Sequence, residues 1–127
     1  MESLKRPLSP HLQIYKPQLT SVLSIMHRGT GVFLSLGALA LTCWLISLAI
    51  GEEIFNSFHQ YMRTWYGKLF LAGFIFSLFY HLVNGVRHLF WDAGLGLDIS
   101  TTYKSGYLTM FLSIFLTIVT LFLGKVI

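Results

Sequence analysis

Residues 69–86 read LFLAGFIFSLFYHLVNGV, a run of 18 residues without Asp, Glu, Lys or Arg. Two more such runs flank it, one of 22 residues over 29–50 and one of 20 residues over 105–124. A helix crosses about 30 Å of hydrocarbon with about 20 residues, and in lipid a lone segment satisfies its backbone groups only as a helix. We therefore expect an all-α integral membrane protein with three transmembrane helices, over about 24–50, 69–91 and 105–125.

The composition agrees with a membrane protein and excludes several soluble classes. Charged residues make up 11% of the 127 residues, whereas soluble domains carry about 25%. The length suits a single domain. The basic residues are spread along the chain instead of clustering on one face, which argues against nucleic-acid binding despite a net charge of +4. A glycine-rich phosphate loop, a CxxC pair and a nucleophile–base motif are all absent from the sequence.

The distribution of Lys and Arg predicts the orientation of the chain. The N-terminal segment and the connection between the second and third runs carry six of them, against three in the first connection and at the C-terminus. Because cytoplasmic or matrix loops are enriched in Lys and Arg, we expect the N-terminus inside. Residues 1–23, broken by Pro7, Pro10 and Pro17, are expected to form a surface segment. The N-terminus does not resemble a transit peptide, which favours a bacterial inner membrane, with a mitochondrially encoded chain as the other origin.

His81 is the most informative polar residue, because it lies inside the second apolar run. Neutral imidazole is a common haem ligand in membranes. Gly73, Ser77, His81 and Gly85 recur every four positions, so one face of this helix is small and allows a macrocycle or another helix to approach closely. The residues alone leave two interpretations open, a haem ligand or a packing histidine bonded to a neighbouring helix.

A second axial ligand for such a haem is not evident in the chain. His88 lies too far along the same helix, and His59 is expected in a loop on the opposite side of the membrane. His27 is expected about 10 Å shallower than His81, near the surface. A six-coordinate haem would therefore take its other ligand from another chain.

A second polar set is expected at the inner surface, comprising Ser24, His27, Arg28, Arg87, His88 and Asp92. Its histidines and arginines would suit haem propionates. A serine and an arginine there would also hydrogen-bond a quinone carbonyl and favour negative charge on its oxygen. The alternative is ordinary snorkelling of basic side chains to the interface, with Arg87 paired to Asp92.

Three stretches of the sequence together resemble a known family. They are RPLSPH at 6–11, SIMHRGTG at 24–31 and HLVNGVRHLFWD at 81–92. These motifs resemble the cytochrome b membrane subunit of succinate dehydrogenase, and the resemblance runs from about Arg6 to the end of the third run. It implies a membrane anchor of complex II without independent activity, in which electrons from succinate pass from a flavoprotein through an iron–sulfur subunit to ubiquinone.

The resemblance also implies roles for individual residues. His81 would be one axial ligand of a haem b shared with a second, smaller membrane subunit, which supplies the other ligand. Ser24 and Arg28 would line the quinone site, and His27 and Arg28 would lie near a haem propionate, with Arg87 and His88 in support. Two alternatives remain, a haem-free anchor with a quinone pocket and a non-redox packing subunit of a transporter.

Overall fold

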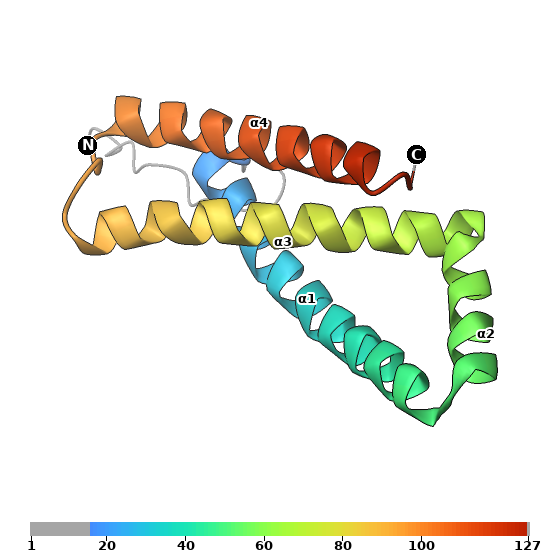
Figure 1. The fold of residues 1–127 in the computed structure, drawn as a ribbon. Helices are drawn as coiled ribbons and strands as arrows, with labels where there is room; N and C mark the ends of the chain where they lie inside the picture. Colours follow the sequence, from blue (N-terminus) through green and yellow to red (C-terminus); the bar gives the residue numbers. More distant parts are fainter. Residues whose placement is uncertain (1–15, 127) are drawn as a thin grey trace, which may run out of the picture.

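The structure is a computed structural model that describes residues 16–126. Over these residues the chain forms four α-helices: α1 (Leu19–Ile50), α2 (Glu52–Arg63), α3 (Trp65–Asp92) and α4 (Ile99–Leu123). Helices α1, α3 and α4, of 32, 28 and 25 residues, are long and apolar enough to cross a membrane. The predicted all-α class with three membrane-spanning helices is thus confirmed (Figure 1).

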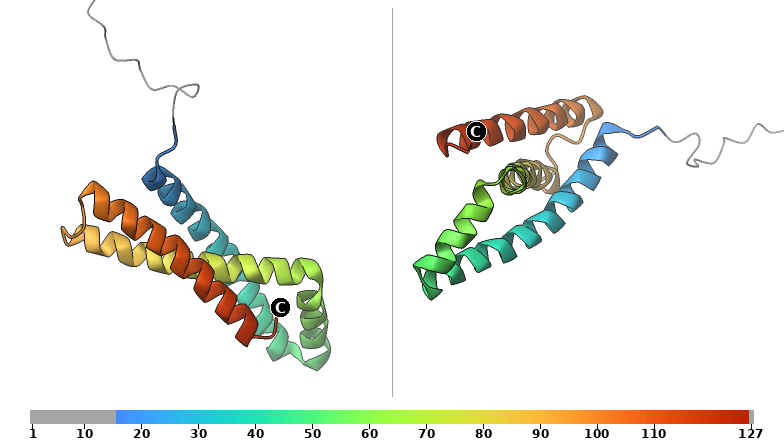
Figure 2. Two further views of the ribbon diagram at one scale, coloured as in Figure 1. Left: turned by 90° about the horizontal axis from the view of Figure 1, so that it is seen from above. Right: turned by 90° about the vertical axis from the view of Figure 1, so that its right-hand side faces the viewer.

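Helix α3 is the centre of the arrangement, because it packs against each of the other three helices. Helix α4 runs antiparallel along one side of α3, while α1 crosses the other side at an angle and then diverges (Figures 1 and 2). Helix α2 spans the gap between the far end of α1 and the start of α3. We call the end at which α1 and α4 begin and α3 ends the His27 end, and the opposite end the α2 end.

The membrane helices extend beyond the charge-free runs. Helix α1 begins at Leu19, inside the expected surface segment, and Gln18 before it makes no side-chain cap. Helix α3 begins after Thr64, whose hydroxyl accepts a hydrogen bond from the Gly67 amide at 3.2 Å. Long basic side chains in the terminal turns reach the interface, so they do not end these helices. Residues 1–15, most of the predicted surface segment, lie outside the described residues.

The connection in which His59 was expected is a short helix, α2, instead of an irregular loop. Gly51, with a φ of 146°, makes the sharp turn that separates α2 from α1. The ring of Phe55 lies 5.9 Å from Trp44 of α1 and 4.5 Å from His59. Phe55, His59 and Met62 follow the spacing of one helical face, and the helix is stabilised by packing this face toward α1 and α3. The 12 residues of α2 are too few to cross a bilayer.

Small and polar side chains fill the interior of the described bundle, while large apolar side chains cover its outside. Among the described residues, only Leu23, Tyr80 and Leu121 are buried large apolar or aromatic side chains. The hydroxyls of Thr109, Ser113 and Thr117 on α4 are buried, and each donates to a carbonyl one turn earlier at 2.9, 2.7 and 2.6 Å. This organisation is typical of membrane bundles, whose helices approach closely through small residues and expose apolar ones to lipid.

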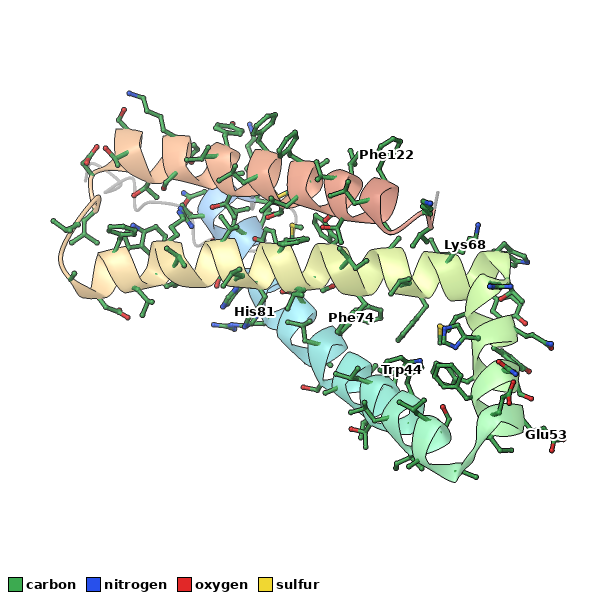
Figure 3. All side chains as sticks on the ribbon, viewed as in Figure 1. Trp44, Glu53, Lys68, Phe74, His81 and Phe122 are labelled. Atoms are coloured by element: carbon green, nitrogen blue, oxygen red, sulfur yellow. The ribbon has the colours of Figure 1, made fainter. Side chains whose placement is uncertain are left out.

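Two glycines set the helix crossings. At Gly37, further along α1 than its crossing with α3 beside His81, an added Cβ would overlap the ring of Phe74, which points toward α1 (Figure 3). At Gly106, where α4 meets α1, an added Cβ would lie 2.8 Å from Cδ1 of Leu23. The angle between α1 and α3 therefore depends on the absence of a side chain at position 37.

Candidate functional site

Three histidines from two helices form a column at the contact of α1 and α3. The rings of His27 and His81 are stacked, with centroids 3.9 Å apart and an interplanar angle of 8°. The ring of His88 lies 5.2 Å from that of His27 at 21°. His81 lies beside the crossing of the two helices, on the side of α3 that faces away from α4 (Figure 3). We call these three residues the histidine column.

The hydrogen bonds of His81 define which of its ring nitrogens is available to a ligand. Its Nδ1 lies 3.1 Å from the His27 carbonyl oxygen and 3.4 Å from Oγ1 of Thr30. A carbonyl only accepts, so Nδ1 carries the proton and donates. In neutral imidazole this leaves the lone pair on Nε2. The side chain is half-buried, so Nε2 can serve as a donor atom to a metal.

His27 does not lie where the sequence placed it. The expected difference in depth of about 10 Å from His81 was wrong, because the two rings are in contact. Helix α1 begins earlier than expected and crosses α3 at this level, which brings His27 beside His81. The two rings are stacked face to face at 3.9 Å, which leaves no room for a haem between them. His27 is therefore not placed to be a second ligand of a haem held by His81. Residues 16–126 contain no three or more His, Cys, Asp or Glu side chains arranged so that together they could hold a metal ion.

The small residues predicted on α3 lie along its contact with α1. An added Cβ at Gly85 would be 3.9 Å from His27, and one at Gly73 would be 3.6 Å from Phe33. Ser77, between them, is buried. This row therefore lies where α1 packs against α3.

Gly31 is a site residue that the sequence reasoning missed. An added Cβ would lie 3.1 Å from Cε1 of His81, closer than at Gly73 or Gly85. Its position four residues after His27, on the same face of α1, was a usable signal. The space beside the His81 ring thus depends on a glycine of the opposite helix.

Ser24 and Arg28 lie on α1 beside His27, four residues apart and therefore on one face. Ser24 is half-buried and Arg28 is exposed. Neither side chain forms a hydrogen bond with any other residue within 16–126. A hydroxyl and a guanidinium are therefore available one turn apart, next to the histidine column.

His88 and Arg87, adjacent in sequence, point in different directions. Nδ1 of His88 donates to the Asn84 carbonyl at 2.7 Å, and its ring belongs to the histidine column. Arg87 is turned toward α4 and is only 7% exposed. Its Nε donates to Oγ of Ser105 at 2.9 Å, and one terminal nitrogen donates to the Thr102 carbonyl at 2.9 Å.

Two further contacts hold the Arg87 guanidinium away from the column. Its other terminal nitrogen donates to Oδ1 of Asn84 at 3.3 Å, and its central carbon lies 4.0 Å above the ring of Trp91. No carboxylate of the described part of the chain pairs with it, Asp92 included. Arg87 therefore joins α3 to α4 in this structure and does not join the polar set predicted around His27.

Tyr80 is a second residue that the sequence reasoning missed. It is fully buried, and its hydroxyl donates to the Leu23 carbonyl at 2.8 Å. Buried hydroxyls in lipid need a partner, so a tyrosine in the middle of an apolar run, directly before His81, was a signal for an interhelical bond.

The chain is similar over most of its length to members of a known family of membrane proteins. Residues 2–120 match the model of the succinate dehydrogenase/fumarate reductase transmembrane subunit family. The succinate dehydrogenase cytochrome b556 subunit of Paracoccus denitrificans is 41% identical over 116 residues, covering 91% of this chain and 89% of the relative. The b556 subunit of Rickettsia typhi is 45% identical over 113 residues, which cover 89% of this chain and 88% of the relative. The cytochrome b560 subunit of Marchantia polymorpha is 42% identical over 123 aligned residues, which cover 91% of this chain and 88% of the relative.

These matches span nearly the whole described bundle, including all residues of the histidine column. Together with the three membrane-compatible helices, they indicate a multi-pass protein of an inner membrane, in agreement with the prediction. The relatives are subunits of an enzyme complex, and so the role of this chain is that of a membrane anchor within one. The chain belongs to the family of transmembrane subunits of succinate dehydrogenase and fumarate reductase.

Proposed function

We propose that this chain holds a haem b through Nε2 of His81 and contributes Ser24 and Arg28 to a site at which ubiquinone is reduced. A second membrane subunit would supply the other haem ligand, because the described residues offer no second histidine placed for it. The electrons come from an iron–sulfur subunit, which receives them from the flavoprotein that oxidises succinate. The observation that carries the proposal is the bond from Nδ1 of His81 to the His27 carbonyl, which leaves Nε2 free.

The surroundings of His81 fit a haem ligand. Metal-bound histidines commonly donate their other ring N–H to a carbonyl, which fixes the tautomer and increases the basicity of the ligating nitrogen. Gly31 and Gly85 keep side chains away from the histidine column. The cytochrome b556 and b560 names of the relatives support the same assignment. When bound, the haem would supply a one-electron redox centre next to the quinone site.

His27, Arg28 and His88 are proposed to bind the haem propionates. Nδ1 of His27 is buried and has no hydrogen-bond partner among residues 16–126. A buried polar atom without a partner is costly, and an anionic oxygen would satisfy a protonated Nδ1. The exposed Arg28 next to it would add a charge-assisted bond. We assign Arg87 to the contact between α3 and α4, because three protein oxygens already accept from its guanidinium.

The quinone site is proposed at the His27 end of the bundle. The Ser24 hydroxyl can donate to a quinone carbonyl, and the Arg28 guanidinium can stabilise negative charge that develops on its oxygen. The excess of Lys and Arg at this end supports a position on the inner side of the membrane, with the N-terminus inside. The iron–sulfur subunit would therefore dock at the His27 end.

The test is a reduced-minus-oxidised absorption spectrum of the complex purified with its partner subunits. Wild type is compared with His81→Leu and with the matched control His59→Leu, whose histidine lies on α2 outside the column. We expect a b-type band in wild type and in His59→Leu, and loss of the band in His81→Leu. The leucine should leave the three helices inserted, because it makes α3 more apolar.

The possible results separate the alternatives. A normal band in His81→Leu would show that another residue holds the haem. No band in any sample, with quinone reductase activity present, would support a haem-free anchor with a quinone pocket.

A further inference from the structure

Two consecutive residues of α3 bind two consecutive turns of α1. The hydroxyl of Tyr80 donates to the Leu23 carbonyl at 2.8 Å, and Nδ1 of His81 donates to the His27 carbonyl at 3.1 Å. Leu23 and His27 are four residues apart, so their carbonyls lie one above the other along α1. A contact at two points fixes both the rotation and the axial position of α1 relative to α3, which a contact at one point cannot do.

The Tyr80 contact is the more rigid of the two. Tyr80 is 0% exposed and Leu23 is 1% exposed, and Leu23 also packs against Gly106 of α4. Helices α1, α3 and α4 thus meet at this point. His81, in contrast, is half-buried and lies in the open column of histidines. The bond at Tyr80 therefore holds the turn of α1 that ends at His27.

The His27 carbonyl is shared between two side-chain donors. Oγ1 of Thr30 donates to it at 2.9 Å, in addition to Nδ1 of His81. Nδ1 lies closer to this carbonyl than to Oγ1 of Thr30, which is 3.4 Å away. The strength of the His81 bond therefore depends on where Tyr80 holds the carbonyl and on how far Thr30 competes for it.

We propose that Tyr80 is a positioning residue for His81, which acts by holding the His27 carbonyl that accepts from Nδ1, and that Thr30 acts on the same carbonyl in the opposite sense. This inference rests on the proposed role of His81 as a haem ligand. A stronger bond from Nδ1–H makes the ligating nitrogen more basic and favours oxidised iron, so it lowers the midpoint potential. Loss of the Tyr80 hydroxyl weakens this bond, and loss of the Thr30 hydroxyl strengthens it.

The experiment is a potentiometric titration of the haem in the purified complex. It compares wild type, Tyr80→Phe, Thr30→Val and the control Tyr107→Phe, in which a 62% exposed tyrosine on α4 loses its hydroxyl. At fixed potential we expect the ratio of reduced to oxidised haem to rise roughly two- to tenfold in Tyr80→Phe, the effect of one weakened hydrogen bond. For a one-electron couple, tenfold corresponds to about 59 mV. Thr30→Val should shift the ratio downward, and Tyr107→Phe should leave it unchanged.

A second readout does not need the haem. Amide hydrogen exchange over residues 24–30 should be faster in Tyr80→Phe than in wild type or Tyr107→Phe, because the turn of α1 has lost its anchor. If the wild-type complex contains no haem but exchange is still faster in Tyr80→Phe, the proposed haem-binding function is refuted and the helix contact is supported. Wild type with haem, and a potential in Tyr80→Phe equal to wild type, overturns the positioning role.

A variant that fails to assemble does not end the test. If Tyr80→Phe yields no complex, Thr30→Val decides whether the His27 carbonyl controls His81. A downward shift of its potential supports the inference, and an unchanged potential overturns it.

Discussion

Substitution of Gly37 by alanine should destabilise the assembled protein through the crossing of α1 and α3. The new Cβ would overlap the ring of Phe74, so either this ring turns out of its present place or α1 moves away from α3. Overpacking of this kind costs about 1–3 kcal/mol. The change from glycine to alanine in a helix recovers about 0.5–1 kcal/mol. We therefore expect a net loss of up to about 2.5 kcal/mol, with a central value near 1 kcal/mol.

The measurement is an unfolding titration with sodium dodecyl sulfate of the complex in mixed micelles, followed by tryptophan fluorescence. The matched control is Gly29→Ala, in the same helix, because nothing lies within 4 Å of a Cβ added there. Gly29→Ala should be neutral or slightly stabilising. Addition of Phe74→Leu to Gly37→Ala should recover at least about 1 kcal/mol of the loss, since the two residues are in contact.

Two results would refute the reasoning. If Gly37→Ala is as stable as Gly29→Ala, the close approach of α1 and α3 is not required for stability. If the effects of Gly37→Ala and Phe74→Leu simply add, the ring of Phe74 is not what the new methyl group meets.

Two further predictions concern the connection between α3 and α4. Arg87→Lys should destabilise the complex by about 1–2 kcal/mol. Arg87 makes two interhelical hydrogen bonds, each worth about 0.6 kcal/mol in membranes, besides a bond to Asn84 and a contact with Trp91 within α3. The same titration on Arg63→Lys, in the exposed face of α2, should show almost no change. The amide of Thr101 donates to the Asp98 carboxylate and lowers the pKa of Asp98 below its usual 3.8. The stabilisation from this cap is present above pH 3.8 and is lost as the pH falls through the lower pKa of the folded state. Below about pH 4, the melting temperature of wild type should therefore fall relative to that of Asp98→Asn. Plots of melting temperature against pH that run parallel for the two proteins would contradict the role of the charge.

The three membrane helices could be predicted from the sequence because each contains a charge-free run of bilayer length. Helix α2 was missed, although Phe55, His59 and Met62 already showed helical spacing, because His59 was expected in a loop and Glu52 and Glu53 make the start of this segment polar. These carboxylates occupy the first turn of α2, where they are favourable near the positive end of the helix dipole. The polar start of a short interfacial helix looks like a loop when only hydropathy is considered.

The sequence identified His81 but not its environment. The position of His27 depends on the angle between α1 and α3, which the contact of Gly37 with Phe74 sets and no periodicity in α1 reveals. The direction of the Arg87 side chain could have been predicted from the sequence more easily than the position of His27. Arg87 follows Tyr80 by seven residues and His88 follows His81 by seven, so each pair shares a face, and the two faces are about 100° apart. This spacing separates Arg87 from the histidine column without any structure.

The hydroxyls of α4 and the guanidinium of Arg87 impose different demands on the chain during its synthesis. Thr109, Ser113 and Thr117 bond to carbonyls of their own helix, so α4 can leave the translocon with these groups already satisfied. Arg87 takes two of its three acceptors from Thr102 and Ser105, which the ribosome adds later. Helix α3 on its own would present an uncompensated cation to the lipid. The nascent chain is therefore expected to release α3 and α4 into the bilayer as a pair, with the first helix free to enter before them.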